Sequence, residues 1–430
     1  MIKFIKKNPA IPQRWIVLTA LAYSLTAAQA QTPQAEKAFI KENMEFATKQ
    51  YSLMMQTPAQ GKNGKAIMPH SMRKDGTPSK GSIYLWTAGF FPGTLWYLSN
   101  YTGDKALQDS ALVYTHQMEP AKTFTDNHDI GFMMYCSYGN ANRLAPKDEY
   151  EDILVESARS LCTRFRPQAK VIQSWNGFRS WHGDKVYDFP VIIDNMMNLE
   201  LLYFASKVTG DPHYAEIANS HAITTAREQF REDYSNYHVV NYDPETGKVL
   251  HKQTCQGFSD NSAWARGQAW AIYGYTMAYR ETKKPEFLEM AQHTAEFWLN
   301  HSNLPEDMVP YWDFNAGQEG YVPEWEYDAN DFKEIPRDAS AAAITASALL
   351  ELYQYVDKKT GKRYYQAAVK TLKSLASPSY LATQGTNGNF LLKHCVGSIP
   401  HKNEIDVPLV YADYYFLEAL HRYKNSKGIK

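Results

Sequence analysis

Two aspartates have surroundings that suit acid–base chemistry. Asp194 directly follows the apolar residues 191–193, at the expected start of a helix. Burial among apolar neighbours disfavours the charged carboxylate and raises its pKa, so such an acid can donate a proton near neutral pH. The alternative is a first-turn acid that the helix dipole favours. Because Asp194 lies inside the apolar run and not before it, the sequence favours the catalytic interpretation.

Asp129 is the candidate for a second carboxylate. It lies in the polar segment 126–129, where Asp126 could equally cap a helix. We expect Asp129 at the same end of the molecule as Asp194, and two carboxylates around one site can hold different protonation states. The pattern predicts that Asp194 is protonated and Asp129 ionised in the first step, with an acidic to neutral pH optimum.

A third group of residues lies in the segment 257–274. If this segment is a helix, Ser262, Arg266 and Trp270 share one face, because they are spaced four residues apart. An arginine can pair with a carboxylate through two parallel hydrogen bonds, and a tryptophan can stack on the apolar face of a sugar ring. The stripe therefore predicts a platform for an anionic sugar. The alternative is a buried structural arginine that is satisfied by carbonyl groups.

The elements that must position these residues are helical. Short breaks rich in Gly, Pro, Asp and Lys recur between helical patterns, which is typical of stacked helical hairpins. The predicted helices span residues 34–56, 86–100, 104–119, 128–143, 147–166, 190–208, 211–230, 260–281, 284–300, 338–357, 361–376 and 408–424. Short and long connections alternate, so the sequence predicts an all-α fold, an (α/α)6 barrel of six helical hairpins. Long loops are often functional, so we expect the site at the long-loop end.

The first thirty residues have the pattern of a targeting segment. Lys3, Lys6 and Lys7 precede an apolar run at 15–28, and small residues follow up to Ala30. This pattern predicts a signal peptide at 1–30 and a single catalytic domain at 31–430, in a periplasmic or secreted protein. The apolar run is too short to span a membrane, and no later stretch is longer, so no membrane span is predicted.

Composition and motifs exclude several classes of protein. The 45 basic and 46 acidic residues give a net charge of −1, which argues against nucleic acid as a partner. No zinc-protease, phosphate-loop or dinucleotide-binding motif is present, and the four cysteines never form a C-x-x-C pair. We therefore predict a monomer without metal or cofactor, and cysteines that are mostly free, buried thiols.

Five segments together resemble one enzyme family. They are Trp86 with residues 87–93, His128 with 129–131, and the segments 191–199, 259–270 and 337–343. In this order along the chain they resemble the unsaturated glucuronyl hydrolases, glycoside hydrolase family 88. The resemblance implies an (α/α)6 barrel enzyme that releases 4,5-unsaturated uronic acid from the non-reducing end of oligosaccharides left by polysaccharide lyases. The implied chemistry is hydration of the vinyl ether, and the implied partner is an oligosaccharide that carries an unsaturated uronate, most simply one derived from a glycosaminoglycan.

The resemblance also implies roles for individual residues. Asp194 matches the general acid/base, and Asp129 matches the carboxylate that holds the ring hydroxyls and tunes Asp194. The matching substrate contacts are Trp86, His128, Trp175, His238, Gln256, Arg266 and Trp270. Ser262 is added from the helix-face argument.

Three other functions remain open at this point. An unsaturated rhamnogalacturonyl hydrolase would share the fold and the chemistry but act on pectin fragments. A sugar epimerase or polysaccharide lyase on the same barrel would need a histidine pair or a tyrosine base, which the predicted helix starts do not show. The third is a non-catalytic glycan-binding protein. The sequence leaves the parent polysaccharide and its sulfation undecided.

Overall fold

The computed structural model describes residues 33–56, 66–73, 75–183 and 185–428. The predicted signal peptide, residues 1–30, lies outside the described residues. Among the helices of the described chain, none combines the length and the apolar character that crossing a membrane requires.

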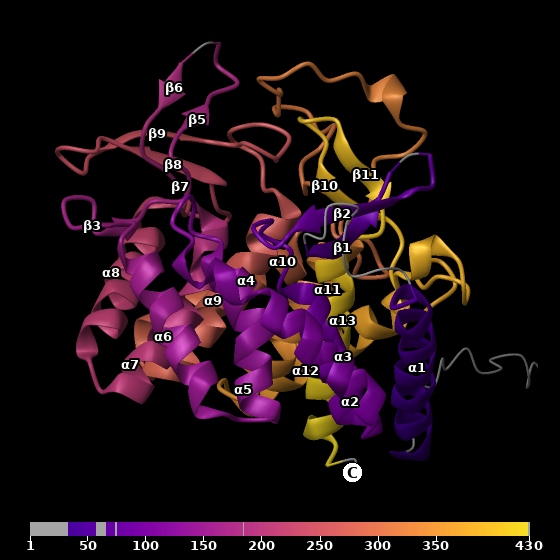
Figure 1. The fold of residues 1–430 in the computed structure, drawn as a ribbon. Coiled ribbons are helices and arrows are strands. Elements are labelled where there is room, and N and C mark those ends of the chain that lie inside the picture. The colour runs from indigo at the N-terminus through magenta and orange to yellow at the C-terminus, as the bar shows by residue number, and fades with distance from the viewer. Residues whose placement is uncertain (1–32, 57–65, 74, 184, 429–430) are drawn as a thin grey trace, which may run out of the picture.

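Twelve helical segments, found in the described residues, pair into six hairpins (Figure 1). Each hairpin has one inner helix. Five of these are α2 (Phe90–Thr102), α7 (Leu199–Thr209), α9 (Ala265–Thr282), α11 (Ala339–Leu352) and α13 (Val410–Ser426). The sixth consists of α4 (Ile130–Met134), a π-helical turn (Tyr135–Gly139) and α5 (Asn140–Leu144) in succession. The outer members are α1 (Pro33–Met54), α3 (Lys105–Gln117), α6 (Asp148–Cys162), α8 (Pro212–Glu228), α10 (Pro285–Asn300) and α12 (Lys358–Leu375). The predicted twelve helices and the (α/α)6 barrel are confirmed.

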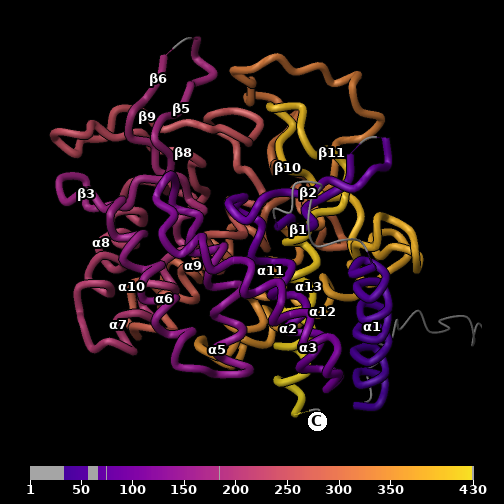
Figure 2. The backbone as a smooth tube through the Cα atoms, in the orientation of Figure 1, coloured from indigo at the N-terminus to yellow at the C-terminus, as the bar shows by residue number. Residues whose placement is uncertain are grey.

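The inner helices close a ring, and Figure 2 shows these helices from the side as a backbone trace. Around the ring, α2 contacts the π-helical turn and α5, α4 contacts α7, and the contacts continue through α9, α11 and α13 back to α2. Every residue of α11 is buried, whereas α12 buries only one stripe of residues. A helix that is enclosed on all sides is apolar all round, and a helix that covers the outside is amphipathic. The two kinds of sequence pattern therefore separate the inner ring from the outer one.

A glycine followed by an aspartate forms the tight turn in two of the short connections. Gly103 and Gly210 end α2 and α7 in the left-handed conformation, with φ of 69° and 73°. The next residue caps the following helix: Asp104 accepts the Ala106 N–H at 2.8 Å, and Asp211 accepts the His213 N–H at 2.9 Å. Glycine tolerates this backbone conformation and aspartate satisfies the free N–H groups, so these local sequences dictate helix–turn–helix units.

The break between the predicted helices 338–357 and 361–376 lies a few residues earlier in the structure. The connection runs from Tyr353 to Asp357, and Asp357 caps α12 by accepting the Lys359 N–H at 2.9 Å. Gly361 is inside α12, and a Cβ atom added to it would lie 2.6 Å from the Tyr353 carbonyl oxygen. This glycine allows close packing of α12 against the end of α11. The predicted helix begins at this glycine, whereas α12 begins three residues earlier, at Lys358.

Two predicted helix starts are also too early. Residues Pro190–Ile192 form strand β7, and a 3-10 turn at Ile193–Asn198 precedes α7. Strand β7 pairs with β8 (Val239–Tyr242), which pairs with β9 (Val249–Gln253). Likewise α9 begins at Ala265, not at 260. These strands form through pairing with distant segments, which a local helical pattern does not reveal.

The long connections carry the remaining strands. These form the antiparallel pairs β1 (Ile67–Met72) with β2 (Pro78–Ser82), β3 (Phe165–Arg166) with β4 (Val171–Ile172), β5 (Phe178–Arg179) with β6 (Val186–Tyr187), and β10 (Cys395–Ser398) with β11 (Asn403–Val407). They gather at the top of the helices in Figure 1. Strand β10 contacts α11, and β1 contacts α2 and α13, so this layer covers the end of the barrel where the inner helices begin.

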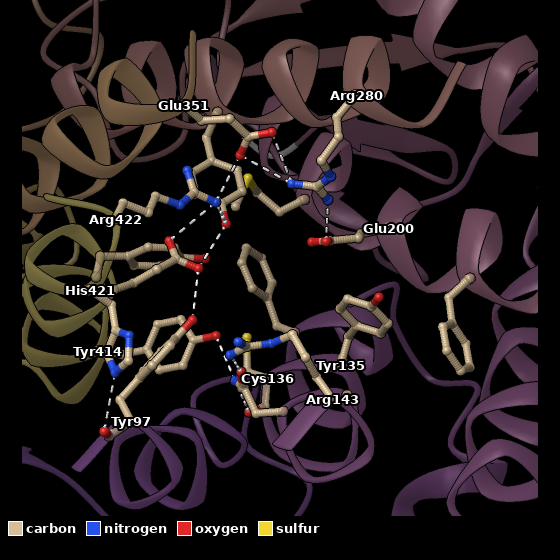
Figure 3. A pocket seen from close by; sticks show the side chains of 18 of the residues that line it. Tyr97, Tyr135, Cys136, Arg143, Glu200, Arg280, Glu351, Tyr414, His421 and Arg422 are labelled. Carbon is tan, nitrogen blue, oxygen red and sulfur yellow. Dashed lines mark hydrogen bonds and ion pairs between the residues drawn. The ribbon is translucent and has the colours of Figure 1, made fainter. Parts of the chain in front are cut away.

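The opposite end of the inner ring holds a polar cavity of about 590 Å³. Figure 3 shows Arg280 between Glu200 and Glu351, while Arg422 lies 2.9 Å from Glu351. These four residues come from α7, α9, α11 and α13. Because the opposite charges neutralise one another, this network ties the inner helices together.

The cysteines behave as predicted. None of the four is in a disulfide; Cys136, Cys255 and Cys395 are buried and Cys162 is half-buried. Burial raises the pKa of the Cys255 thiol, and the charge of Asp194 adds to this shift. Such thiols stay protonated and fill space in the core.

Alanine in place of glycine usually stabilises a helix, but the close contact at Gly361 predicts that alanine destabilises the protein at this position. Gly361→Ala should gain about 0.5–1 kcal/mol from helix propensity. Displacing the Tyr353 carbonyl should cost about 1–3 kcal/mol, so we expect a net loss of stability. Thermal unfolding measures it, with Lys362→Ala as the control because Lys362 is the next residue of α12 and is exposed. A Gly361→Ala protein at least as stable as wild type would contradict this account of the glycine.

Candidate active site

The ends of neighbouring inner elements bring the two candidate carboxylates into one region. Asp129 is the residue before α4, and Asp194 lies in the 3-10 turn before α7. The helix α4 contacts this turn, and the turn contacts α9. Each carboxylate side chain keeps 12% of its surface exposed, so both are largely desolvated yet reach solvent.

Desolvation sets the protonation of this pair. Burial raises the pKa of Asp129 to about 8; the charge of Asp194 adds to the shift and Arg164 opposes it. Burial raises the pKa of Asp194 to about 7, opposed by Arg266, a backbone N–H and the Trp270 indole. Because burial is the main cause for both groups, both carboxyl groups stay protonated to higher pH than ordinary aspartates. Interacting carboxylates titrate as a unit, so near neutral pH the pair can hold a proton that either group can carry.

His238 presents a proton to Asp194. Its Nδ1 accepts the N–H groups of Cys255 and Gln256 at 3.3 and 3.1 Å. Burial and then the charge of Arg266 lower the pKa of His238 well below its usual range, so the ring is neutral. A neutral imidazole whose Nδ1 accepts carries its hydrogen on Nε2. That atom lies 3.6 Å from Asp194 Oδ2, so the ring faces the carboxylate as a donor.

His128 occupies a comparable place beside Asp129. Its Nε2 lies 3.3 Å from Asp129 Oδ1, and burial lowers its pKa to about 3, so this is not an ion pair. Ser174 holds the residue, because its carbonyl accepts the His128 N–H at 3.1 Å and its hydroxyl lies 3.3 Å from Nδ1. The same hydroxyl accepts the Ile192 N–H at 2.9 Å. One serine therefore joins the two segments that carry the carboxylates.

Arg266 is engaged mostly by the protein itself. Its Nη2 donates to the Gly397 carbonyl and to Gln256 Oε1, each at 2.7 Å. Its Nη1 donates to the Val396 carbonyl and lies 3.3 Å from Asp338 Oδ2. These atoms cannot form the predicted two hydrogen bonds to a substrate carboxylate, because they already bond to protein groups. Through these contacts the guanidinium joins α9 to β10 and to the start of α11. Its charge still reaches Asp194.

Ser262 does not lie on the predicted helix face. It precedes α9, and its hydroxyl donates to Asp313 Oδ2 at 2.7 Å while accepting the Ser259 N–H at 3.0 Å. Its side chain is buried. The shared face therefore contains only Arg266 and Trp270, and Ser262 stabilises the turn before the helix.

Two of the aromatic candidates, Trp86 and Trp270, pack on a common ring. Trp86 packs on Phe132 and Tyr411, with ring centroids 5.5 and 4.9 Å apart. Trp270 packs on the same Phe132 at 5.2 Å. Trp270 is fully buried, unlike the sugar-stacking ring that the sequence predicted, whereas Trp86 is only half-buried.

Trp175 and Gln256 are the other two candidates that reach the surface. Both are half-buried. Trp175 meets the ring of His238 edge-on at 6.4 Å, and Gln256 both donates its N–H to His238 and accepts from Arg266. The structure therefore brings all the predicted site residues except Ser262 to one region, in which Trp86, Trp175 and Gln256 are the accessible ones.

Several polar atoms at the centre of this region are buried without a hydrogen-bond partner. They include Asp194 Oδ2, His128 Nε2, His238 Nε2 and Trp270 Nε1. Buried polar groups are nearly always hydrogen-bonded, so such a concentration indicates a place where a polar ligand completes the bonding. The arrangement can deliver a proton, receive one, and hold hydroxyl groups.

Three residues of this region were missed by the sequence interpretation. Trp264 stacks on His238 at 4.3 Å, Tyr411 packs on Trp86, and the charge of Arg164 lowers the pKa of Asp129. Trp264 lies in the segment already singled out, and Tyr411 is the second residue of an inner helix. Arg164 follows an outer helix and carries no local signal.

A separate group at the rim could hold a metal ion. His182, His251 and Asp260 place their ligand atoms within 4.8 Å of one another. The sequence predicted no metal, because these residues lie far apart in the chain and match no known spacing.

The chain is similar to known proteins over most of its length. The profile described as Glycosyl Hydrolase Family 88 matches residues 59–426. A protein of Formosa agariphila named unsaturated glucuronyl hydrolase is 50% identical over 341 residues, which cover 79% of this chain and 80% of that protein. A protein of Streptococcus pyogenes serotype M1 named unsaturated chondroitin disaccharide hydrolase is 33% identical over 397 residues, covering 89% of this chain and 91% of that protein.

The fold is similar to solved structures as well. An unsaturated glucuronyl hydrolase described as specific for heparin superposes with a TM-score of 0.82 at 44% identity, covering 91% of this chain and 99% of that one. The corresponding enzyme of Bacillus sp. GL1, described as responsible for the degradation of glycosaminoglycan, gives a TM-score of 0.78 at 29% identity, covering 91% and 97%.

The raised pKa of Asp194 predicts that this carboxylate destabilises the folded chain as pH rises. In the unfolded chain an aspartate ionises near pH 4, whereas the folded value is about 7. Between these values the folded state binds more protons, so stability falls as pH increases. Asp194→Asn should therefore stabilise the protein by about 1–3 kcal/mol near pH 8 and by much less near pH 5. Thermal unfolding at both pH values tests this, and an equal effect at both would contradict the raised pKa.

Proposed function

The chain belongs to glycosyl hydrolase family 88, and from this premise we propose that it releases 4,5-unsaturated uronic acid from the non-reducing end of lyase-generated oligosaccharides, with Asp194 as the general acid/base. The observation that carries the assignment of the residue is the pair of desolvated carboxylates, Asp129 and Asp194, beside neutral histidines. A carboxyl group with a pKa of about 7 can both donate and accept a proton near neutral pH.

The reaction needs one group that moves a proton in each direction. Asp194 donates its proton to C4 of the C4=C5 double bond, and the positive charge that develops at C5 is shared with the ring oxygen. Water adds at C5 and returns a proton to Asp194. The hemiketal formed at C5 opens by cleavage of the bond between C5 and the ring oxygen, which leaves a ketone at C5 and the former ring oxygen on C1 as a hydroxyl group. C1 is then a hemiacetal, and it becomes an aldehyde as the remaining sugar departs as an alcohol. No covalent bond to the protein is required.

The neighbours of Asp194 favour this sequence of steps. Asp129 holds ring hydroxyls and, when charged, keeps the pKa of Asp194 high. His238 Nε2–H steadies the Asp194 carboxylate once its proton has left. The accessible Trp86, Trp175 and Gln256 contact the sugars, whereas Arg266 acts through its charge on Asp194 and through the position of β10.

A glycosaminoglycan fragment is the substrate that the comparisons favour. The heparin-specific relative superposes more closely than the Bacillus enzyme, and a chondroitin disaccharide hydrolase is among the more distant relatives in sequence. We therefore place unsaturated heparin disaccharides first, then chondroitin disaccharides. An unsaturated rhamnogalacturonyl disaccharide ranks below both, and the family membership argues against a non-catalytic glycan-binding protein.

The cellular setting is part of the same proposal. Residues 1–30 direct export, and residues 31–430 act as one catalytic domain, monomeric, in the periplasm or outside the cell. Lyases that act on polysaccharides outside the cytoplasm would supply the substrate there.

The direct test follows the ultraviolet absorbance of the unsaturated uronate. Hydration removes the conjugation between the C4=C5 double bond and the carboxylate, so absorbance falls as the substrate is consumed. We expect the fastest loss with unsaturated heparin or chondroitin disaccharides. Preference for a rhamnogalacturonan-derived disaccharide would support the pectin alternative, and constant absorbance across the panel would support glycan binding without catalysis.

Replacing the proposed acid/base should abolish turnover without unfolding the chain. Asp194→Asn should lower kcat by at least ~10²–10⁴-fold, the usual contribution of a general acid/base. The control is Asp188→Asn, the same change of charge at an exposed site in the same segment, which should leave kcat near the wild-type value. A near-native rate for Asp194→Asn, measured with the absorbance assay, would reject the assignment.

The rate should also fall on the alkaline side of neutrality. Asp194 must be protonated for the first step, and its pKa is about 7, so the competent fraction declines as pH rises past that value. A profile of kcat/KM against pH measures the ionisation in the free enzyme. We expect a descending limb near neutral pH, and a rate that is constant or still rising through about pH 9 would contradict a raised Asp194 pKa.

A further inference from the structure

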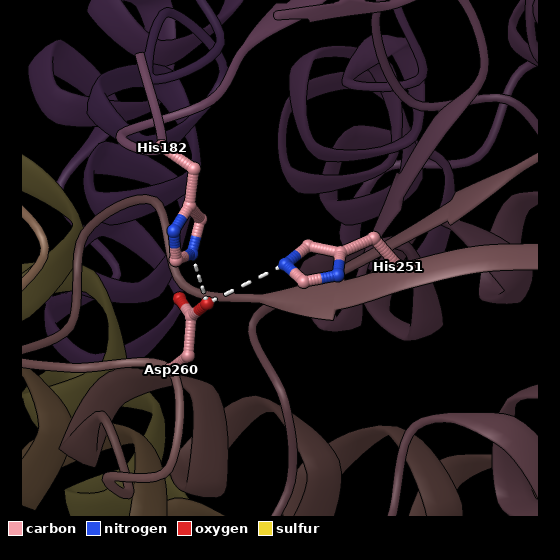
Figure 4. A group of neighbouring side chains, drawn as sticks. All are labelled: His182, His251 and Asp260. Carbon is pink, nitrogen blue, oxygen red and sulfur yellow. Dashed lines mark hydrogen bonds and ion pairs between the residues drawn. The ribbon is translucent and has the colours of Figure 1, made fainter.

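Three side chains from separate segments converge at the rim of the barrel. His182 lies in the β5–β6 hairpin, His251 in β9, and Asp260 in the turn before α9. Figure 4 shows both imidazole rings directed at one carboxylate. His182 Nε2 lies 2.6 Å and His251 Nε2 3.6 Å from the same oxygen, Asp260 Oδ2. The three ligand atoms thus meet around one point, although the residues span 78 positions of the chain.

The distances suit a first-row metal ion. Zinc binds imidazole nitrogen and carboxylate oxygen at about 2.0–2.2 Å, so neighbouring ligands of a tetrahedral ion lie about 3.3 Å apart. The two distances from histidine nitrogens to Asp260 Oδ2, 2.6 and 3.6 Å, bracket that value, and all three ligand atoms lie within 4.8 Å of one another. Small side-chain rotations would bring all three atoms into place. Two histidines and one carboxylate form a recognised zinc ligand set, which leaves one position for water.

The carboxylate is already oriented by a second set of contacts. Asp260 Oδ1 accepts the Thr254 N–H at 2.8 Å, which leaves Oδ2 to face the histidines. The carboxylate of Glu324 accepts the Asp260 N–H at 3.1 Å and adds negative charge beside the group. Hydrogen bonds of this kind hold metal ligands in position and tune their affinity.

The group is open to ions from solvent. The side chains of His182 and His251 are 44% and 38% exposed, and that of Asp260 is 18% exposed. The ligands are therefore accessible, with the carboxylate the most protected of the three.

We propose that His182, His251 and Asp260 form a binding site for a divalent ion of the zinc type that clamps the β5–β6 hairpin to the rim of the active site. The hairpin already touches this rim, because the Trp181 indole donates to the Cys255 carbonyl at 3.0 Å. The metal extends that contact into a cross-link between three segments, and it acts as a structural ion that takes no part in the hydration step.

The clamp connects to the catalytic region through the backbone. Asp260 holds the Thr254 N–H, and the next two N–H groups, of Cys255 and Gln256, donate to His238 Nδ1. These last two bonds set the tautomer that faces Asp194. Fixing Asp260 therefore fixes the segment that positions His238.

Metal binding is tested on the full-length mature chain after treatment with chelator and dialysis. Zinc(II) is titrated by calorimetry, bound metal is counted by elemental analysis, and thermal unfolding is recorded with and without zinc. We expect one zinc per chain and a rise in unfolding temperature on adding it. His182→Gln and His251→Gln should each weaken binding by at least ~10-fold, the scale on which metal sites respond to lost contacts, and should lose the thermal shift.

A matched control separates this site from an ordinary histidine–carboxylate pair. His394 Nδ1 lies 2.5 Å from Asp406 Oδ1, also at an exposed position. Neither residue belongs to the group of three potential metal ligands formed by His182, His251 and Asp260. His394→Gln should therefore keep the wild-type affinity and stoichiometry. Equal zinc binding by wild type, His182→Gln and His251→Gln, or no stoichiometric binding by wild type, would overturn the proposal.

Cobalt(II) gives a second readout that does not depend on stability. A site with two nitrogens, one oxygen and water should bind cobalt in a four-coordinate geometry with strong visible absorption bands. We expect these bands with wild type and His394→Gln and their loss with His182→Gln. Only weak bands typical of hydrated cobalt with wild type would argue against the site. Neither outcome bears on whether the chain hydrates unsaturated uronates, so the two proposals stand or fall separately.

Discussion

The cost of removing two neighbouring carboxylates from water is the constraint on which the site depends. Asp129 and Asp194 begin inner elements of the same ring, and the surrounding apolar and aromatic packing leaves each with little exposed surface. Desolvation raises the pKa of both, which stores free energy that the rest of the fold must supply. A closed ring of inner helices can supply it, because α9, α11 and α13 bury most of their residues in the core.

Hydrogen bonds hold the residues around this pair of carboxylates in fixed orientations. Ser174 joins the segments that carry the carboxylates. The N–H groups of Cys255 and Gln256 determine which nitrogen of His238 carries the hydrogen. Arg266 links α9 to β10, and its charge opposes the rise in the pKa of Asp194. Several buried polar atoms of this site, among them Asp194 Oδ2 and Trp270 Nε1, have no hydrogen-bond partner in the protein, so a polar ligand can complete their bonding.

Local sequence patterns predicted the barrel well and its boundaries less well. The pairing of Gly103 with Asp104 encodes a turn through backbone conformation and capping, so both neighbouring helices were found. The Gly361 region was misread, because the packing against Tyr353 that requires glycine is a tertiary contact. The same limit explains β7, which depends on pairing with β8, and Ser262, whose partner Asp313 is distant in the chain.

The chemical character of Asp194 was determined by the sequence itself, since an acid within an apolar run must either find a partner or change its pKa. Alternation of short and long loops likewise determined which helix starts share an end of the barrel. Only the tertiary structure decided that Arg266 is occupied by carbonyl groups and that Asp129 is as strongly desolvated as Asp194. It also brought His182, His251 and Asp260 together. These properties depend on distances between segments remote in sequence, because Coulomb forces and hydrogen bonds act over a few ångströms of space and not along the chain.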